Sequence, residues 1–318
     1  MPGKVDPTQA EMVAAVSLGY PGRMTLMRPG STYARPVPVT TPQVFRSSDF
    51  VKRRLVQLKR GGQLVPVKAG WYLLERDLPD NKYERRRALM LARIHTHALT
   101  LPDGLLVSHR SAGLLLGFPS MQDPGCVEVS NFRDLQFSRT GVRVHKRPNE
   151  ELESIYCNST AVTTPRVTAV ELLRILTPSS ALAIADYALR IGCQLEDLQS
   201  INRSLSLPRG RAHADRVLAL ADAGAESPQE SVLRHWTIAA GFPEVLTQRP
   251  VHTRIKTYFL DMAIEELKLA IEYDGEPKYA DRQVLVAEKR REDAIREQGW
   301  EFVRVTKEDL RDVRALVA

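Results

Sequence analysis

Apolar residues recur along this chain with two different periods, and each period predicts a different type of element. Spacing by three and four residues predicts amphipathic helices, whereas strict alternation predicts strands. Alternation is clear in residues 267–275, Leu-Lys-Leu-Ala-Ile-Glu-Tyr-Asp-Gly, where Gly275 closes the run. We therefore predict a central strand here that is buried on at least one face.

The two periods continue through the rest of the chain and predict a multi-domain α/β protein. After residue 224 the predicted order is α-β-β-β-α-β, which suits a mixed sheet flanked by helices, whereas the middle of the chain reads as mostly helical. Residues 19–41 are rich in Gly and Pro and predict irregular structure. Helices are expected over residues 9–16, 81–99, 108–116, 165–176, 180–191, 195–205, 211–223 and 282–298, and strands over residues 126–129, 142–145, 245–251, 258–263 and 300–305.

Carboxylates gather at the polar end of the central strand. Glu272 and Asp274 are two residues apart, so on a strand they project to the same side with roughly 7 Å between their Cα atoms. Asp261 ends the preceding apolar segment, and the ten residues between it and Glu272 are about enough for one strand to turn into the next. Clustered carboxylates repel unless a cation joins them, and their hard oxygens suit Mg²⁺ or Mn²⁺. Ordinary strand-end acids paired with Lys or Arg are the alternative.

The C-terminal part of the chain resembles a known nuclease group. Asp261, the run 272–275 (Glu-Tyr-Asp-Gly), Arg291-Glu292 and Gly299-Trp300 followed by strand 301–305 look like the very-short-patch-repair-like endonucleases of the PD-(D/E)XK superfamily. The resemblance covers roughly residues 225–310. It implies a restriction-endonuclease-like sheet in which Asp261, Glu272 and the Tyr273 carbonyl hold a metal ion, with Asp261, Glu272, Asp274 and Lys278 as catalytic candidates.

Two positions depart from this resemblance. The third motif position is usually a lysine and is Asp274 here, so Lys278, Lys289 or Arg291 would have to substitute for it, or the site is degenerate. In the resembling families a histidine commonly follows the run, and this chain has Lys278-Tyr279 instead.

Glu230 carries two interpretations. Ser227-Pro228-Gln229-Glu230 opens a helix as a capping box, with Ser227 at the N-cap, Pro228 at the first helical position and Glu230 at the third. In the resembling nuclease families an acid on this first helix often completes the metal cluster, which makes Glu230 a third candidate ligand beside Asp261 and Glu272. The two roles do not exclude each other.

Near the N-terminus the pattern predicts a winged helix-turn-helix. Ser47 or Ser48 can cap a helix with apolar positions Phe50, Val51, Leu55 and Leu58, and Gly61-Gly62 ends it. Segments 64–67 and 70–74 then form a hairpin that turns at residues 68–70. Candidate DNA contacts are Lys52, Arg53, Lys59, Arg60 and, at the wing tip, Lys68, with Lys289, Arg290 and Arg291 as a second basic group. A solvated helix face followed by a structural hairpin is the alternative.

A looser resemblance supports the winged helix. Residues 60–64 (Arg-Gly-Gly-Gln-Leu) with Gly70-Trp71-Tyr72 look like the N-terminal module of abortive-infection antitoxins of the AbiEi type. Residues 108–112 (Ser-His-Arg-Ser-Ala), 117–119 and 163–166 look like that family's middle region. The resemblance implies a DNA-binding protein.

The positive net charge of the chain favours DNA as a binding partner. The chain carries a net charge of +7, and residues 1–80 hold 12 Lys and Arg against 6 Asp and Glu, so nearly all the excess lies where DNA could meet it. No apolar run approaches the roughly 20 residues of a membrane span, and residues 1–10 lack the apolar core of a signal peptide. We therefore expect a cytoplasmic protein with no membrane partner. The three cysteines show no zinc or redox spacing.

Three segments and two functions follow from these patterns. We expect a winged-helix module over residues 1–80, an antitoxin-like α+β region over 81–223 and a nuclease-like domain over 224–318. The favoured function is a DNA-binding, Mg²⁺- or Mn²⁺-dependent endonuclease that acts in defence against foreign DNA or in repair. The alternative is an antitoxin-like transcriptional regulator with an inactive nuclease-like domain. A homodimer is left open.

Overall fold

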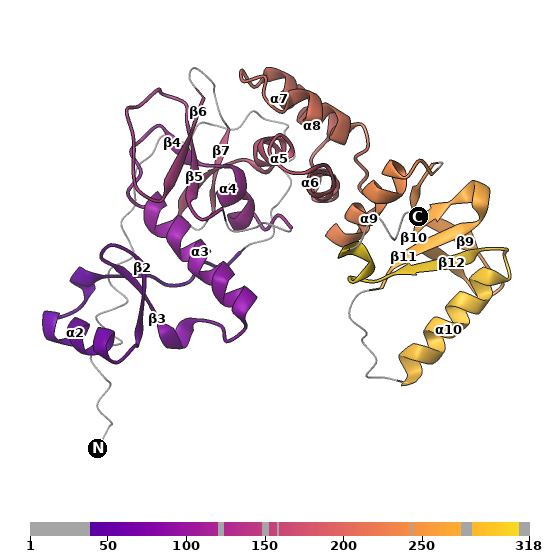
Figure 1. Ribbon diagram of the computed structural model, residues 1–318, viewed down its shortest axis with the longest axis horizontal. Helices are drawn as coiled ribbons and strands as arrows, with labels where there is room; N and C mark the ends of the chain where they lie inside the picture. Colours follow the sequence, from indigo (N-terminus) through magenta and orange to yellow (C-terminus); the bar gives the residue numbers. More distant parts are fainter. Residues whose placement is uncertain are drawn as a thin grey trace. The chain divides into compact units, whose positions relative to one another are not determined.

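The computed structural model describes residues 39–119, 124–147, 153–157, 159–242, 244–274 and 282–311 (Figure 1). The chain divides into two compact units, which among these residues comprise 41–96 in the first and 39–40 with 97–311 in the second. Helices and sheets occur in both units, so the predicted α/β class is confirmed. The helix expected over residues 9–16 lies outside the described residues. Within the described residues, no helix is long and apolar enough to cross a membrane.

The first unit is a small antiparallel sheet with two helices. Its strands β1 (Phe45–Arg46), β2 (Leu64–Lys68) and β3 (Trp71–Leu74) take the order β1-β3-β2, and its helices are α2 (Lys52–Arg60) and α3 (Lys82–Ala98). The predicted hairpin is present and turns through Gly70, whose φ of 77° favours glycine. Leu73 of the hairpin packs with Ala92 of α3 in the core of this unit.

The first helix begins later than the pattern predicts. Residues Ser47–Asp49 form a separate 3₁₀ turn, because the Asp49 carboxylate accepts the Arg46 N–H at 2.6 Å and so holds the chain in a tight loop. Helix α2 then starts at Lys52, after Val51 in an extended conformation. Neither Ser47 nor Ser48 caps α2.

The second unit opens with a five-stranded mixed sheet that the sequence did not predict in full. Its order is β6-β5-β4-β8-β7, with β4 beside β8 and β5 beside β6 in parallel. The strands expected near residues 126–129 and 142–145 are β5 and β6, whereas β4, β7 and β8 are only three or four residues long, too short to show a clear alternation. The elements are β4 (Leu105–Val107), α4 (His109–Leu115), β5 (Val127–Asn131), β6 (Val142–Lys146), β7 (Ser154–Cys157), β8 (Thr160–Thr163), α5 (Pro165–Leu173), α6 (Pro178–Arg190), α7 (Leu195–Ser204) and α8 (Arg211–Leu218).

The C-terminal sheet has the predicted order of elements. Helix α9 (Pro228–Ala239) precedes β9 (Leu246–His252), β10 (Thr257–Ile264) and β11 (Leu269–Tyr273), and α10 (Arg282–Arg296) precedes β12 (Glu301–Val305). In space the strands take the order β12-β11-β10-β9, with only the β11–β12 pair parallel. Each face has its own core. Leu233 of α9 packs with Met262 and Ile271, whereas Ile295 of α10 packs with Leu260 and Ala270, so the two helices cover opposite faces (Figure 1).

A buried ion pair joins the C-terminal sheet to the preceding helices. Arg234 of α9 donates from Nη2 to both carboxylate oxygens of Asp186 on α6, at 2.7 and 2.8 Å, and from Nη1 to the Leu220 carbonyl at 2.7 Å. Both side chains are almost fully buried. The connection at Gly224 is equally tight, because a Cβ there would collide with the Thr247 hydroxyl. The sequence-predicted boundary at residue 224 is therefore a close-packed junction.

Candidate active site

Asp261 and Glu272 lie side by side on neighbouring strands. β10 and β11 pair in an antiparallel register that sets Met262 opposite Ile271. Asp261 and Glu272 are the next residues along these two strands, and the charge of Glu272 acts on Asp261 by raising its pKa, so the two carboxylates lie near each other. Glu272 is buried and Asp261 is half-buried. The structure therefore brings these two predicted site residues together.

Glu230 reaches the same neighbourhood from α9. Its backbone N–H donates to Ser227 Oγ at 3.2 Å, which confirms Ser227 as the N-cap. Its own carboxylate accepts, through Oε2, the N–H of Glu226 at 2.8 Å. A standard capping box would direct this bond to the N-cap residue itself, so the reciprocal bond is shifted by one residue. The capping role is real, and it uses one of the two carboxylate oxygens.

The electrostatics of Asp261 link all three acids. Burial is the largest cause that raises the pKa of Asp261 to about 6, and the negative charges of Glu230 and Glu272 act in the same direction. Arg291 opposes them by lowering the pKa, and Glu226 adds a smaller upward effect. Carboxylates from three separate elements thus repel one another at Asp261, an arrangement that favours a bound proton or cation.

Arg291 of α10 supplies positive charge at this site. Its Nη2 lies 2.6 Å from Glu272 Oε1 and also donates to the Phe259 carbonyl at 3.1 Å, while Nη1 donates to Glu288 at 3.0 Å. Because these acceptors come from β11, β10 and α10, the guanidinium is fixed in place. The sequence nominated Arg291 both for DNA contact and as a substitute for the missing lysine, and the structure places it on Glu272.

The side chains near Asp261 decide whether a metal ion could be held at this site. Among the described residues, no group of three or more His, Cys, Asp or Glu side chains lies close enough together to hold a metal ion. Asp261 and Glu272 remain a pair whose carboxylate oxygens suit a hard divalent ion. Arg291 already contacts Glu272, so such an ion would have to share or displace the guanidinium.

The other C-terminal candidates lie around this pair. Asp274 directly follows β11, and its N–H donates to the Val305 carbonyl at 2.9 Å, which extends the ladder toward β12 by one residue. Lys278 lies outside the described residues. Lys289 and Arg290 are exposed on α10, two residues and one residue before Arg291.

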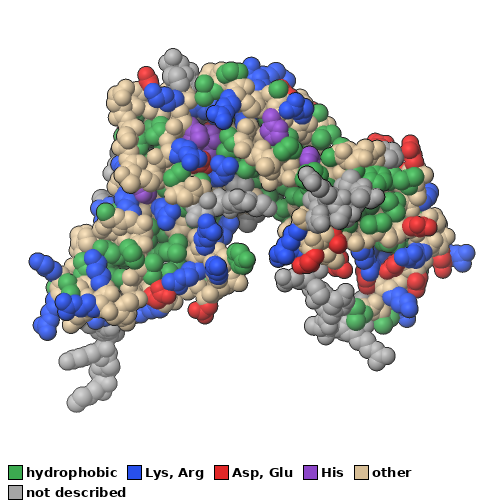
Figure 2. Space-filling model, in the orientation of Figure 1, with side chains coloured by type: hydrophobic (Ala, Val, Ile, Leu, Met, Phe, Trp, Pro, Cys, Tyr) green, Lys and Arg blue, Asp and Glu red, His purple; other side chains and the backbone are tan. Residues whose placement is uncertain are grey.

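The predicted N-terminal contacts form a basic surface on α2. Lys52, Arg53 and Arg60 are exposed and line an open hollow together with Val56 and Gln57. Figure 2 shows Lys and Arg side chains gathered over this helix. Helix α2 contains no acidic residue, so its charge is not neutralised locally.

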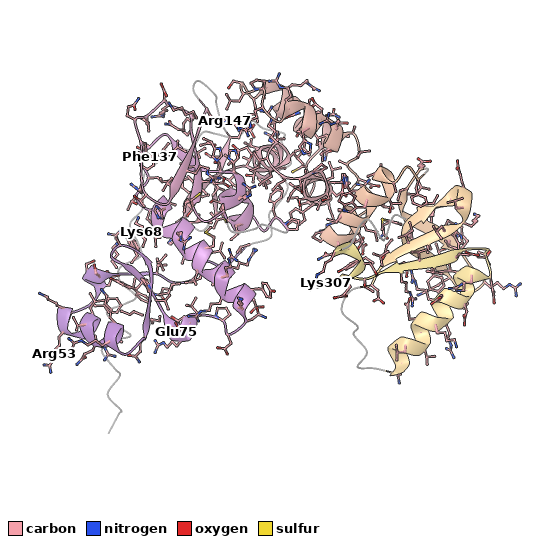
Figure 3. All side chains as sticks on the ribbon, in the orientation of Figure 1. Arg53, Lys68, Glu75, Phe137, Arg147 and Lys307 are labelled. Atoms are coloured by element: carbon pink, nitrogen blue, oxygen red, sulfur yellow. The ribbon has the colours of Figure 1, made fainter. Side chains whose placement is uncertain are left out.

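Two of the predicted lysines contact the protein itself. The Lys59 ammonium lies 4.6 Å from the centre of the Tyr72 ring while the side chain stays exposed. Lys68 is half-buried, because its ammonium donates to the Thr96 carbonyl at the end of α3, at 3.0 Å. Arg53 instead points outward from α2 (Figure 3). The structure therefore gives Lys68 a structural contact at the position where the sequence predicted a wing tip.

Comparison with known proteins finds relatives without an established activity. No family model matches the chain. Two proteins of Mycobacterium tuberculosis, uncharacterized protein MT2308 of strain CDC 1551 / Oshkosh and uncharacterized protein Rv2248 of strain ATCC 25618 / H37Rv, are each 29% identical over 265 residues, which is 80% of this chain and 90% of the relative. The crystal structure of the RV2827C protein from Mycobacterium tuberculosis aligns with 61% of this chain and 76% of that chain, at 15% identity and a TM-score of 0.36.

The sequence did not identify the Arg291–Glu272 contact as a structural pair. Nineteen residues separate the two side chains, and residues 275–281 between them include the candidate Lys278. The helical spacing of α10 could have indicated this contact. Ala294 and Ile295 are buried in the core, and Arg291 lies one turn earlier on the same face of the helix, so its side chain is directed toward the sheet.

Proposed function

We propose that this protein is a divalent-metal-dependent DNA endonuclease whose site is built on Asp261 and Glu272. The observation that carries the proposal is the pair of carboxylates on the adjacent strands β10 and β11, with the pKa of Asp261 raised to about 6 by burial and by Glu230 and Glu272. Such repulsion destabilises a fold unless the site binds a cation or a proton. The resemblance of the run 272–275 to nuclease motifs adds the reaction class.

In this proposal each residue has a separate task. Asp261 and Glu272 would hold Mg²⁺ or Mn²⁺, and the bound ion would neutralise charge on the scissile phosphate and lower the pKa of an attacking water. Arg291 would supply the positive charge that a motif lysine gives in the resembling families, since it is fixed beside Glu272 by Glu288 and the Phe259 carbonyl. Exposed Lys289 and Arg290 would contact DNA phosphates.

The basic surface of α2 supports DNA as the substrate. Lys52, Arg53 and Arg60 form no ion pair with any residue that the structure describes, so they are available to phosphates. We propose that this surface supplies most of the affinity for DNA, while the carboxylate pair supplies the chemistry.

Cleavage of supercoiled and linear DNA with Mg²⁺, Mn²⁺ or EDTA tests the proposal. Asp261→Asn and Glu272→Gln should each reduce cleavage at least about a hundredfold, because each removes a ligand charge. Glu265→Gln is the matched control. Glu265 lies between β10 and β11 and pairs with Arg249 and Lys268, so its loss should leave cleavage unchanged. Cleavage that persists in Asp261→Asn or Glu272→Gln would contradict the proposal.

Glu230→Gln separates the capping role from a ligand role. A glutamine can still accept the Glu226 N–H through its amide oxygen, so stability should change little. A ligand role predicts a large fall in cleavage that added metal partly restores, whereas a capping role alone predicts parental cleavage. Ser227→Ala is the control, since loss of the N-cap oxygen should cost about 1 kcal/mol of stability and leave metal dependence alone.

A DNA-binding regulator is the second candidate. The observation that favours it is the Arg291–Glu272 ion pair, in which a guanidinium already compensates the carboxylate that a metal would need. A regulator should bind duplex DNA through α2 and leave it intact with every metal tested. Binding without cleavage would therefore favour the regulator, and metal-dependent cleavage lost in Asp261→Asn would exclude it.

A further inference from the structure

Side chains of β10 change from one face of the C-terminal sheet to the other in the middle of the strand. On a regular strand, side chains two residues apart lie on the same face. Tyr258 and Leu260 pack in the core that α10 covers. Met262 and Ile264, which continue the same period, pack instead in the core that α9 covers. The alternation of β10 therefore changes phase between Leu260 and Met262, at Asp261.

The neighbouring strand β9 changes face as well. Val251 packs in the core that α10 covers, whereas Val245, the residue before β9, packs in the core that α9 covers. An even number of residues separates the two valines, so a regular strand would keep them on one face. β11 stays regular, because Leu269 and Ile271 both pack in the α9 core. The change of face thus belongs to the β9–β10 hairpin.

Gln248 lies at the level of this change on β9. Its neighbours Thr247 and Arg249 both pair with β10, at the residues on either side of Asp261. Gln248 has a φ of 47°, in the left-handed region, whereas strand residues are extended. A residue in this conformation interrupts the ladder and redirects the side chains around it. The backbone of Gln248 therefore accounts for the change of face in both strands.

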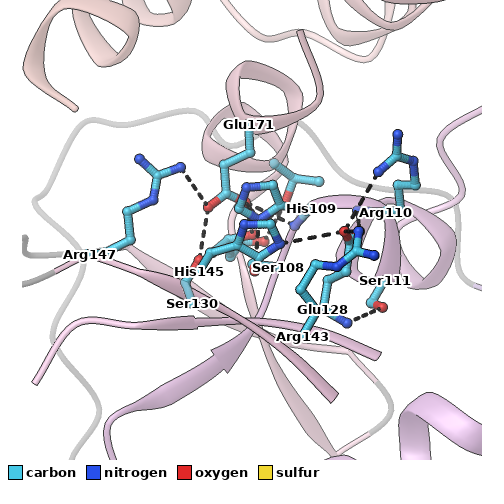
Figure 4. A network of polar contacts seen from close by, with 12 residues as sticks. Ser108, His109, Arg110, Ser111, Glu128, Ser130, Arg143, His145, Arg147 and Glu171 are labelled. Carbon is cyan, nitrogen blue, oxygen red and sulfur yellow. Dashed lines mark hydrogen bonds and ion pairs between the residues drawn. The ribbon is translucent and has the colours of Figure 1, made fainter. Parts of the chain in front are cut away.

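The setting of Gln248 differs from that of other left-handed residues. His109, with a φ of 52°, begins α4 in a buried polar network, where its N–H donates to Glu171 at 3.0 Å and its ring stacks on His145 (Figure 4). Lys268, with a φ of 50°, ends a 3₁₀ turn. Helix ends and turns commonly use this conformation, whereas Gln248 holds it inside a strand. Strain of this kind beside a candidate site residue is typical of functional sites.

The change of face lets acids from both layers act on Asp261. Glu230 comes from α9, whereas Glu272 of β11 contacts Arg291 of α10. Burial, followed by the charges of Glu230 and Glu272, raises the pKa of Asp261. A regular strand would turn the Asp261 side chain toward one helix layer only.

We propose that Gln248 is a positioning residue of the carboxylate site, because its left-handed backbone produces the change of face that brings Asp261 within reach of both Glu230 and Glu272. Gln248 acts through its main-chain conformation, so its side-chain amide is not the group that the site requires. This inference rests on the proposed function for the purpose of the site, but the environment of Asp261 can be measured without cleavage.

Titration of the Asp261 carboxyl by nuclear magnetic resonance, in the full chain labelled with ¹³C aspartate, tests the proposal. The Asp261 signal is assigned with Asp261→Asn. Gln248→Val should straighten β9, because a β-branched side chain disfavours a positive φ. The pKa of Asp261 should then fall from about 6 toward 3.8. Gln248→Gly should titrate as the parent does, since glycine adopts the left-handed conformation without strain.

Lys268→Val is the matched control. It places the same side chain at a left-handed residue of a turn, outside the strands, and should leave the Asp261 titration as in the parent. A parental titration in Gln248→Val would overturn the proposal. An equal change in Gln248→Gly and Gln248→Val would also overturn it, because the side chain and not the backbone would then set the environment of Asp261.

A second substitution covers a failure to fold. If Gln248→Val does not fold, Gln248→Ala replaces it, because alanine also disfavours a positive φ but carries no β-branch. The pKa of Asp261 should again fall, and a parental titration in Gln248→Ala would then overturn the proposal.

Mn²⁺ affinity separates this inference from the proposed function. If the parent binds Mn²⁺, Gln248→Val should bind it at least about tenfold more weakly, whereas Gln248→Gly should match the parent. Equal Mn²⁺ affinity in Gln248→Val and the parent would count against the positioning role. If the parent neither binds Mn²⁺ nor cleaves DNA, the proposed function fails, and the Asp261 titration still decides whether Gln248 positions this carboxylate.

Discussion

Arg291 Nη2 lies 2.6 Å from Glu272 Oε1, so a fixed guanidinium holds one of the two carboxylates that a metal ion would use. This contact makes metal binding and the Arg291 ion pair competing events at one oxygen atom. It also links the two functional candidates, because an endonuclease must release or share this carboxylate and a regulator need not.

Removing the guanidinium charge should therefore strengthen metal binding. We expect Arg291→Gln to bind Mn²⁺ at least about tenfold more tightly than the parent, since Glu272 loses its competing cation. Electron paramagnetic resonance of free Mn²⁺ measures the affinity. The neighbouring exposed Arg290→Gln is the control and should behave as the parent. Equal Mn²⁺ affinity in all three proteins would show that Glu272 is not a ligand.

The raised pKa of Asp261 predicts a pH dependence with a definite sign. An acid whose pKa is higher in the folded state contributes stability that is complete below its unfolded pKa and is lost as the pH rises through the folded pKa. For Asp261 this window runs from 3.8 to about 6. Asp261→Asn should therefore be more stable than the parent above pH 6, by about 1 kcal/mol once screening at a partly exposed group is allowed for. Urea unfolding across this range measures it.

Glu265→Gln is the control of opposite sign for that measurement. A hydrogen bond from Arg249, together with one from Lys268, lowers the pKa of Glu265 from 4.5 to about 2. Its stabilising effect is present above pH 4.5 and is lost as the pH falls toward 2. Glu265→Gln should therefore lose stability at neutral pH, where Asp261→Asn gains it. If the free energy of unfolding changes in the same direction in both variants at neutral pH, the repulsion among Asp261, Glu230, Glu226 and Glu272 does not control stability.

The basic surface of α2 predicts how DNA affinity responds to salt. Each phosphate that a side chain neutralises releases counterions, so Lys52→Gln and Arg53→Gln should each flatten the log–log dependence of affinity on salt by about 1. Fluorescence anisotropy with duplex DNA measures the slope. Lys68→Gln is the control, because its ammonium is bound to the Thr96 carbonyl and should leave the slope unchanged. A reduced slope in Lys68→Gln alone would place the DNA surface on the hairpin.

The buried Asp186–Arg234 pair predicts a non-additive effect on stability. Arg234→Met should cost about 3 kcal/mol, because it leaves Asp186 buried without its partner. The double variant Asp186→Leu/Arg234→Met should recover most of this loss, since two apolar side chains leave no unpaired charge. Urea unfolding of both variants and of Asp186→Leu completes the cycle. Strict additivity of the single losses would mean that the two residues are not energetically coupled.

The sequence predicted the C-terminal sheet well because its signals are local and long. The alternation in β11, the apolar segments of β9 and β10, the N-cap at Ser227 and the helix at α10 all depend on neighbours within a few residues. The meeting of Asp261 with Glu272 followed from the same patterns, since a short connection between two strands constrains them to pair. The nearness of the two carboxylates was therefore predictable, and their roles as ligands stay a prediction.

The middle sheet was less predictable for a physical reason. β4 has only three residues, all buried, so it shows no alternation and cannot be distinguished from a buried helical turn by period. Its place in the sheet depends on partners far away, β5 and β8. The alternation of Arg143, His145 and Arg147 is visible in the sequence. The contact that Arg147 makes, however, is with Glu171, which is remote in the chain.

The Asp186–Arg234 pair also constrains how this protein can be divided or recombined. A fragment that begins at Gly224 would carry Arg234 without Asp186 and would expose the face of α9 that packs on α6. Gene fusions joined at that glycine would inherit the same defect. The C-terminal sheet is thus not an exchangeable module by itself, and the smallest segment that could be transferred between proteins intact begins at or upstream of Pro178, where α6 begins.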